Sequence, residues 1–268
     1  MSISSLWKFP FLGLYVLLAA PLWAQAGAGI PRMPDGKPNL NGIWQAMNTA
    51  NWELEAHAAR PGLVVALGAK GAEPGGMGVV EGGEIPYLPA AREQKNANFA
   101  HRLTGDPEVK CFLPGVPRAT YMPYPFQIFH SEKAIFFAYE YDGAVRNIYL
   151  EDPGPPPADS WMGQSYGRWE GDTLVVDVKG LDERTWLDRA GDFHSDALHV
   201  VERYTLASPG ILMYEATIED PKVYSRPWKI EMPLYRHVEK DARLMEFKCV
   251  EFAEDLMYGR YSKKPTKP

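Results

Sequence analysis

The polar stretch at residues 182–199 holds the side chains best suited to acid–base chemistry. It carries His194 and His199, each with carboxylates close by in the sequence, and it joins two predicted strands. Long loops on a rigid scaffold often carry functional groups. A histidine that an aspartate orients can act as a general base near neutral pH, so we expect His194 to work with Asp188 or Asp192, and His199 beside them. The alternative is that these polar groups only cap turns within the loop.

Two other kinds of site, a serine nucleophile and a metal site, fit the sequence less well. The run Gly163-Gln164-Ser165-Tyr166-Gly167 has the Gly-x-Ser-x-Gly spacing of a nucleophile elbow, but an elbow needs a strand, a sharp turn and then a helix, and a hairpin is predicted here. His194, His199 and an aspartate could bind a metal ion, although their spacing matches no compact zinc motif. We therefore predict neither a serine hydrolase of this type nor a metal site.

A β-hairpin at residues 160–180 must support this loop. Gly171 supplies a turn conformation that residues with a Cβ disfavour, and the β-branched arm that follows favours extended backbone. Leu174, Val176 and Val178 fall on one face of that arm, while Val175 and Asp177 fall on the other face.

The rest of the chain predicts a mainly β fold with long loops and one helix at residues 89–103. Pro89 begins the predicted helix, and Gly105 with Pro107 ends it. After a first strand near residues 42–44, further strands are predicted at 63–67, 119–130, 134–141, 144–150, 199–206, 211–219, 224–234 and 244–251. Strands of this length with short turns indicate an antiparallel meander, closed as a barrel or folded as a sandwich.

Several large or charged side chains are candidates for ligand binding. His199 and Arg203 share one face of their strand, and in a closed barrel that face could line the mouth. Arg118, Arg168 and Glu251 are candidates for the same interior, with structural ion pairs as the alternative for each. Most tryptophans are expected in the core, and some could form an aromatic wall for a flat or apolar ligand. The candidates for that wall are Trp161, Trp169 and Trp186.

The first 26 residues resemble a secretory signal. Lys8 gives a positive start, residues 9–18 form a short apolar run, and Ala24-Gln25-Ala26 has the small residues of a cleavage site. An uncleaved anchor is the alternative, but Pro10 and Pro21 interrupt the run. We expect cleavage near Ala26, a single β-rich domain at residues 27–262, a disordered basic tail at 263–268, and a periplasmic or secreted protein that is not integral to a membrane.

The two cysteines, Cys111 and Cys249, are expected to form a disulfide in such a compartment. The closed loop is long, so the chain-entropy model assigns the bond about 4–5 kcal/mol of stability. The alternative is a catalytic thiol, which would need a nearby base and a reducing environment.

Composition narrows the range of partners. The formal net charge of −6 argues against nucleic acid. The chain has neither the Gly-x-Gly-x-x-Gly nor the phosphate-loop pattern, and it has no Cys-x-x-Cys-His. We therefore predict no cofactor and a small-molecule ligand or substrate; the sequence leaves the oligomeric state open.

Several motifs resemble those of a large family of secreted bacterial proteins that are usually called hypothetical proteins. They include residues 34–38 (Pro-Asp-Gly-Lys-Pro), 165–176 (Ser-Tyr-Gly-Arg-Trp-Glu-Gly-Asp-Thr-Leu-Val-Val) and 217–221 (Thr-Ile-Glu-Asp-Pro). The resemblance implies a secreted, β-rich protein and no particular activity. Many relatives end with a Cys-His-Glu-Gly-Asn run, whereas this chain has Val250 after Cys249. If that histidine serves chemistry in relatives, this chain lacks the reaction or performs it otherwise.

Together these features predict an extracytoplasmic, barrel-like protein that binds a small, partly apolar or aromatic molecule. Such a protein could also be a cofactor-independent lyase, isomerase or hydrolase that uses histidine–carboxylate chemistry. The alternative is a non-catalytic envelope or protein-interaction module, in which the aromatic residues would form an exposed patch.

Overall fold

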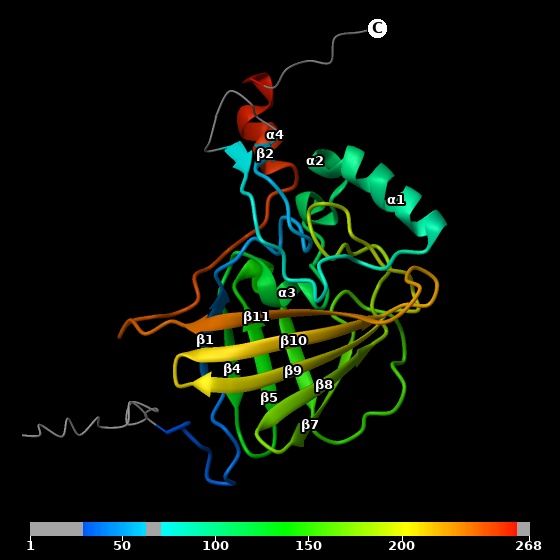
Figure 1. Ribbon diagram of the computed structural model, residues 1–268. Coiled ribbons are helices and arrows are strands. Elements are labelled where there is room, and N and C mark those ends of the chain that lie inside the picture. Colours follow the sequence, from blue (N-terminus) through cyan, green and yellow to red (C-terminus); the bar gives the residue numbers. More distant parts are fainter. Residues whose placement is uncertain (1–28, 63–70, 262–268) are drawn as a thin grey trace, which may run out of the picture.

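The computed structural model describes residues 29–62 and 71–261 of the chain (Figure 1). The expected signal sequence, the strand predicted at 63–67 and the basic tail at 263–268 lie outside the described residues. Within the described part, every helix is too short or too polar to cross a membrane.

A closed barrel of nine strands forms the body of the protein, which confirms the mainly β prediction and selects the barrel over the sandwich. Around the barrel the order is β1-β11-β10-β9-β8-β7-β6-β5-β4, and β4 pairs with β1 to close it. The β6–β7 pair is parallel and the other neighbouring pairs are antiparallel. The strands are β1 (Gly42–Ala46), β4 (Phe126–His130), β5 (Ile135–Tyr139), β6 (Val145–Tyr149), β7 (Gln164–Glu170), β8 (Thr173–Lys179), β9 (His199–Ser208), β10 (Ile211–Glu219) and β11 (Trp228–Arg236).

The predicted hairpin is the β7–β8 pair. Glu170 pairs with Thr173, and Gly171 between them has a φ of 60°, a conformation that favours glycine. Leu174, Val176 and Val178 are fully buried inside the barrel, as their alternation predicted.

The barrel interior contains a buried ion pair among aromatic rings. Glu202 on β9 pairs with Arg146 on β6 and also accepts hydrogen bonds from the hydroxyls of Tyr204 (2.9 Å) and Tyr214 (2.8 Å). The Arg146 Nε donates to the Ser165 hydroxyl at 2.7 Å. These side chains and the surrounding aromatic rings are buried in the barrel interior.

The face of β9 that carries His199 and Arg203 points outward from the barrel, so the expectation that these two residues line the barrel mouth is wrong. The inward face of β9 carries Val200, Glu202 and Tyr204, which are fully buried. An alternating pattern identifies two faces of a strand, and burial of the more apolar face decides which one is inside.

The predicted helix is confirmed, and two predicted strands differ from the structure. α1 (Pro89–Ala100) begins at the predicted proline, and the short α2 (Arg102–Gly105) completes the predicted helical region. Residues 119–130, predicted as one extended strand, divide into α3 (Arg118–Tyr121) and β4. Residues 244–251 form no strand, because β11 already pairs with β10 and β1, so the described barrel has no free edge there.

Irregular segments and short helices cover one end of the barrel, where α3 lies (Figure 1). They include the two-stranded ribbon of β2 (Arg60–Pro61) and β3 (Ala72–Glu73), the 3-10 helix η2 (Pro107–Lys110) and α4 (Ala253–Tyr258). Two further 3-10 turns are η3 (Tyr141–Gly143) and η4 (Gly259–Tyr261). The disulfide between Cys111 and Cys249 joins residues of this covering region and confirms the predicted pairing.

Candidate functional site

The two aspartates predicted to orient His194 instead hold their own loop in place. Asp188 Oδ2 accepts a hydrogen bond from the Leu54 amide at 2.9 Å, and its Oδ1 accepts from the Asp192 amide at 3.1 Å. The Tyr87 hydroxyl donates to Asp192 at 2.7 Å. Burial, and then the neighbouring Asp192 carboxylate, raise the pKa of Asp188 well above its usual value. The contact between the Asp192 amide and Asp188 lies within the loop, as the turn-capping alternative expected, and the other two contacts tie the loop to Leu54 and Tyr87.

His194 is buried and hydrogen-bonded on both sides of its ring. Its Nδ1 faces the Ser195 carbonyl at 2.8 Å, and the geometry therefore assigns the ring proton to Nδ1. Its Nε2 lies 2.6 Å from the Thr185 hydroxyl, which donates to it in this tautomer. Burial lowers the pKa of His194 below the usual value. Burial thus favours the neutral histidine, and the groups that orient its ring are a hydroxyl and a carbonyl rather than the aspartate expected from the sequence.

His199 lies on the outer surface, between carboxylates of the two neighbouring strands. Its Nε2 is 2.9 Å from Asp177 Oδ2 on β8, and its Nδ1 is 3.6 Å from Glu219 Oε2 on β10. It lines a shallow hollow of about 420 Å³ with Lys179 and Asp196. Within the described residues, no group of three or more histidine, cysteine or carboxylate side chains is arranged to hold a metal ion.

Arg118 belongs to a buried network of ion pairs and hydrogen bonds in the covering region. Its guanidinium donates to Asp106 at 2.8 and 2.9 Å, to Glu108 at 2.7 Å and to Asn51 at 2.8 Å. Its side chain is 1% exposed. Arg118 therefore anchors η2 through structural ion pairs, which was the alternative to a role in ligand binding.

The three tryptophans expected to form one wall are in three different places. Trp161 packs against Phe112 with tilted rings, whose centroids are 4.7 Å apart. Trp169 lies beside His130 near the barrel wall, with 5.5 Å between centroids. Trp186 lies against α2 in the covering region.

Three more candidates lie at the surface. Arg168 and Arg203 project from the outer face of β7 and β9, and each pairs with Glu170, at 3.0 and 2.9 Å. Glu251 is exposed in the C-terminal segment. The residues singled out from the sequence are thus distributed over several sites, and a catalytic role for His194, Asp188, Asp192 or His199 stays a prediction.

A cavity of about 830 Å³ beside the disulfide is the best candidate for a functional site. We call it the disulfide pocket. It lies between the C-terminal segment, which follows β11 and includes α4, and the rest of the covering region. Both Cys249 and Glu108 line it. Its aromatic lining residues are Trp52, Tyr124, Tyr141, Phe247, Phe252 and Tyr258.

One wall of the disulfide pocket is an aromatic cluster. Phe247 contacts Tyr124 and Tyr141, with centroids 4.7 and 5.3 Å apart. Tyr141 also donates a hydrogen bond to the Glu108 carbonyl at 3.3 Å. This cluster joins the C-terminal segment to the turn between β5 and β6.

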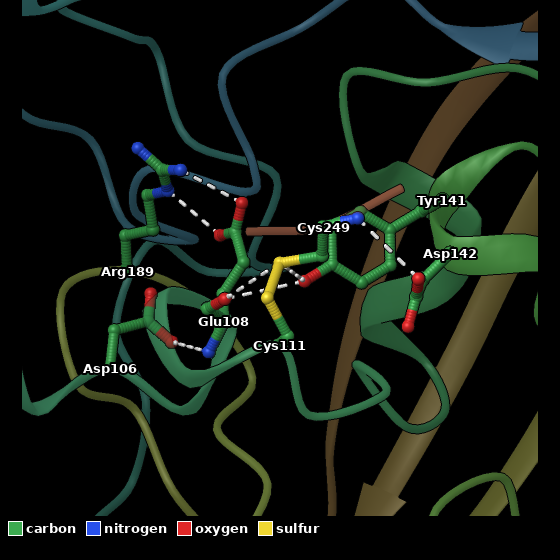
Figure 2. The surroundings of a disulfide bond; sticks show 7 residues. All are labelled: Asp106, Glu108, Cys111, Tyr141, Asp142, Arg189 and Cys249. Carbon is green, nitrogen blue, oxygen red and sulfur yellow. Dashed lines mark hydrogen bonds and ion pairs between the residues drawn. A yellow bond between two sulfur atoms is a disulfide. The ribbon is translucent and has the colours of Figure 1, made fainter. Parts of the chain in front are cut away.

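Fixed charges lie on the other side of the pocket. Arg189 donates two hydrogen bonds of 2.8 Å to Glu108 beside the disulfide, as Figure 2 shows, and its guanidinium lies 4.4 Å from the ring centre of Trp52. Burial opposes the charge of Glu108, but Arg189 and Arg118 outweigh it and lower the pKa of Glu108 to about 2. The pocket therefore holds a carboxylate and a guanidinium that neutralise each other.

Sequence analysis missed the aromatic residues of this pocket. Trp52, Tyr124 and Tyr141 come from separate irregular segments with no motif to mark them. The signal available was the predicted disulfide, because a bond from Cys111 to Cys249 must bring their chain neighbours together. On that basis Phe247, two residues before Cys249, could have been placed close to Cys111.

Comparison with protein-family models and with curated proteins finds no match to this chain. The resemblance to a secreted bacterial family therefore stays a prediction.

Proposed function

We propose that this protein binds a small, largely aromatic or apolar molecule in the disulfide pocket. The observation that carries the proposal is a cavity of about 830 Å³ lined by six aromatic side chains. Small-molecule sites in proteins typically have volumes of roughly 300–1,000 Å³, an apolar lining and a few polar groups that fix orientation.

The lining also carries the carboxylates of Glu254 and Asp255, so a negative group on the ligand would have to bind beside Lys248 and away from them. Arg189 is neutralised by Glu108, and Arg102 is paired with Glu73 at 3.0 Å. Lys248 at the pocket lining is exposed, and within the described residues its ammonium group forms no ion pair. An aromatic body among the rings with an anionic group near Lys248 would use both features.

The barrel interior is a poorer candidate than the covering region. Its inward side chains are buried, and Glu202 pairs with Arg146 at its centre, while Arg146 Nη1 and the Tyr139 hydroxyl have no hydrogen-bond partner among the described residues. A ligand there would have to displace buried aromatic rings, which a native core resists because it is densely packed.

The proposed setting is outside the cytoplasm. The disulfide supports it, because such bonds persist mainly in oxidising compartments. Cleavage of the predicted signal sequence can be checked by N-terminal sequencing of the protein recovered from the periplasm or the medium, and we expect a start near Gly27.

The binding proposal can be tested with 1-anilinonaphthalene-8-sulfonate, a fluorescent aromatic sulfonate. Val250 lines the pocket and is 58% exposed, so Val250→Trp should fill the cavity without disturbing the core. Val238 is 80% exposed and is not a lining residue, so Val238→Trp is the matched control. We expect Val250→Trp to weaken dye binding about tenfold or more, the size of a lost binding hot spot.

Equal dye binding by the wild type and both variants would contradict the proposal. The dye would then be bound elsewhere, and a protein-interaction module would become the better interpretation. If a substrate is found, a His194→Ala variant tests the predicted acid–base role of His194, which lies outside the lining of this pocket; lost turnover with retained affinity would support that role.

A further inference from the structure

Much of one wall of the disulfide pocket comes from a C-terminal segment with little regular structure. β11 ends at Arg236, and residues 237–252 contain neither helix nor strand. Lining residues from Phe247 to Tyr258 belong to this segment and to α4. The pocket therefore exists only while the segment stays against the covering region.

Few contacts other than the disulfide hold the segment. The Met245 amide donates to the Glu140 carboxylate and the Phe252 amide donates to the Val109 carbonyl, each at 2.7 Å. Phe247 adds its contacts with the aromatic cluster. Such a segment, with few buried contacts, belongs to the least stable part of a fold.

The other end of the disulfide is firmly anchored. Cys111 follows η2, whose Glu108 is held by Arg118 from behind and by Arg189 in front. Figure 2 shows Arg189, Glu108 and the two cysteines side by side. The bond from Cys111 to Cys249 thus fastens a loosely held wall to a rigid element.

We infer that the disulfide is a redox-sensitive latch that controls ligand binding at this pocket, an inference that rests on the proposed function. Both cysteines are half-buried and Cys249 lines the pocket, so a dithiol reductant would approach the bond from the cavity. One thiolate of the reductant attacks a protein sulfur and releases the other cysteine as a thiolate; the second thiol of the reductant then breaks the mixed disulfide. Two protein thiols and one oxidised dithiol result, and the electrons and protons balance.

Opening the latch removes the pocket wall and leaves the barrel closed. Cys111 and Cys249 both lie outside the strands, and the barrel is closed by the pairing of β1 with β4 and β11. The segment would then be held by its chain connection to β11 and by the few contacts named above, so it would open more often. The ligand would therefore be released while the barrel stays folded.

The test uses the full mature chain with and without dithiothreitol and has two independent readouts. The first is titration with 1-anilinonaphthalene-8-sulfonate, for which we expect about tenfold weaker binding after reduction, since the wall is lost. The second is trypsin cleavage after Lys248, which does not depend on the dye. We expect this cleavage to become about tenfold faster after reduction, because the segment opens more often.

A Cys111→Ser/Cys249→Ser variant controls for effects of the reductant itself. It should match the reduced wild type in both readouts and should not respond to dithiothreitol. Cleavage after Lys179, in the barrel strand β8, should stay slow in every sample.

The outcomes separate the two proposals. Unchanged cleavage after Lys248 upon reduction would overturn the latch, whether or not the dye binds, and equally fast cleavage after Lys179 would overturn it by showing global unfolding. If the oxidised protein fails to bind the dye but cleavage after Lys248 still accelerates, the binding proposal fails and control of the segment by the disulfide stands.

Discussion

Replacing Glu202 with glutamine should strongly destabilise the barrel. The Glu202 side chain is fully buried and neutralises Arg146, while accepting hydrogen bonds from the Tyr204 and Tyr214 hydroxyls. Glutamine keeps the shape and one acceptor oxygen, but it leaves the guanidinium without its counter-charge. Removing one partner of a buried ion pair typically costs about 3–5 kcal/mol, because the remaining charge stays buried and uncompensated.

The assay is urea unfolding of the wild type and variants, with the free energy of unfolding extrapolated to water. Glu215→Gln is the matched control, because Glu215 projects from the outer face of β10 and pairs with Lys229 at 3.2 Å. This partly exposed pair should contribute less than about 1 kcal/mol. A double variant, Arg146→Met/Glu202→Gln, should recover much of the loss, since it removes the uncompensated guanidinium and keeps an acceptor oxygen for the two tyrosine hydroxyls.

One result would refute this reasoning directly. If Glu202→Gln and Glu215→Gln lower the free energy of unfolding equally, the pair with Arg146 is not the buried element described above. A double variant that is less stable than Glu202→Gln would also contradict it.

Two more predictions concern packing and pH. A Cβ added at Gly167 would lie 2.5 Å from Ile148 Cγ2 across the β6–β7 pair, so Gly167→Ala should lower the free energy of unfolding in urea by about 1–3 kcal/mol. Gly210→Ala is the control: its Cβ would have nothing within 4 Å, so the free energy should change by less than about 0.5 kcal/mol. Equal effects of the two substitutions would contradict the crowding at Gly167. Burial, and then Asp192, raise the folded-state pKa of Asp188 above its unfolded value, so the folded protein holds the proton more tightly and stability should fall as pH rises above the unfolded pKa of 3.8. Asp188→Asn removes this titration, so the variant should become more stable relative to the wild type as the pH rises from 4 to 8. A stability difference between the two proteins that does not change with pH would count against the raised pKa of Asp188.

The strands and the hairpin could be predicted because their signals are local. Alternation along residues 199–206 and a glycine at residue 171 are properties of a few neighbours, and the structure has β9 and the β7–β8 turn there. The same holds for Pro89 at the start of α1.

The inner face of the barrel could not be identified in the same way. His199 and Arg203 on one face were expected to meet solvent, a carboxylate or a cavity, and they meet the carboxylates of Asp177 and Glu170 outside the barrel. The inward face carries Glu202, whose partner Arg146 lies 56 residues away in the sequence. Only the closed topology shows that these two charges can neutralise each other.

The disulfide pocket was missed for a related reason. Its walls come from irregular segments that the bond between Cys111 and Cys249 brings together across a sequence separation of 138 residues. Such walls have no periodicity to read. The sequence could predict the bond but not the cavity beside it.

The measurement that tests the central claim most directly is a crystal structure of the mature protein soaked with 1-anilinonaphthalene-8-sulfonate. Binding in the disulfide pocket predicts electron density for the dye between Trp52 and Phe247, with its sulfonate toward Lys248. Density for the dye only on the outer surface of the barrel, with the pocket closed by its own side chains, would contradict the account.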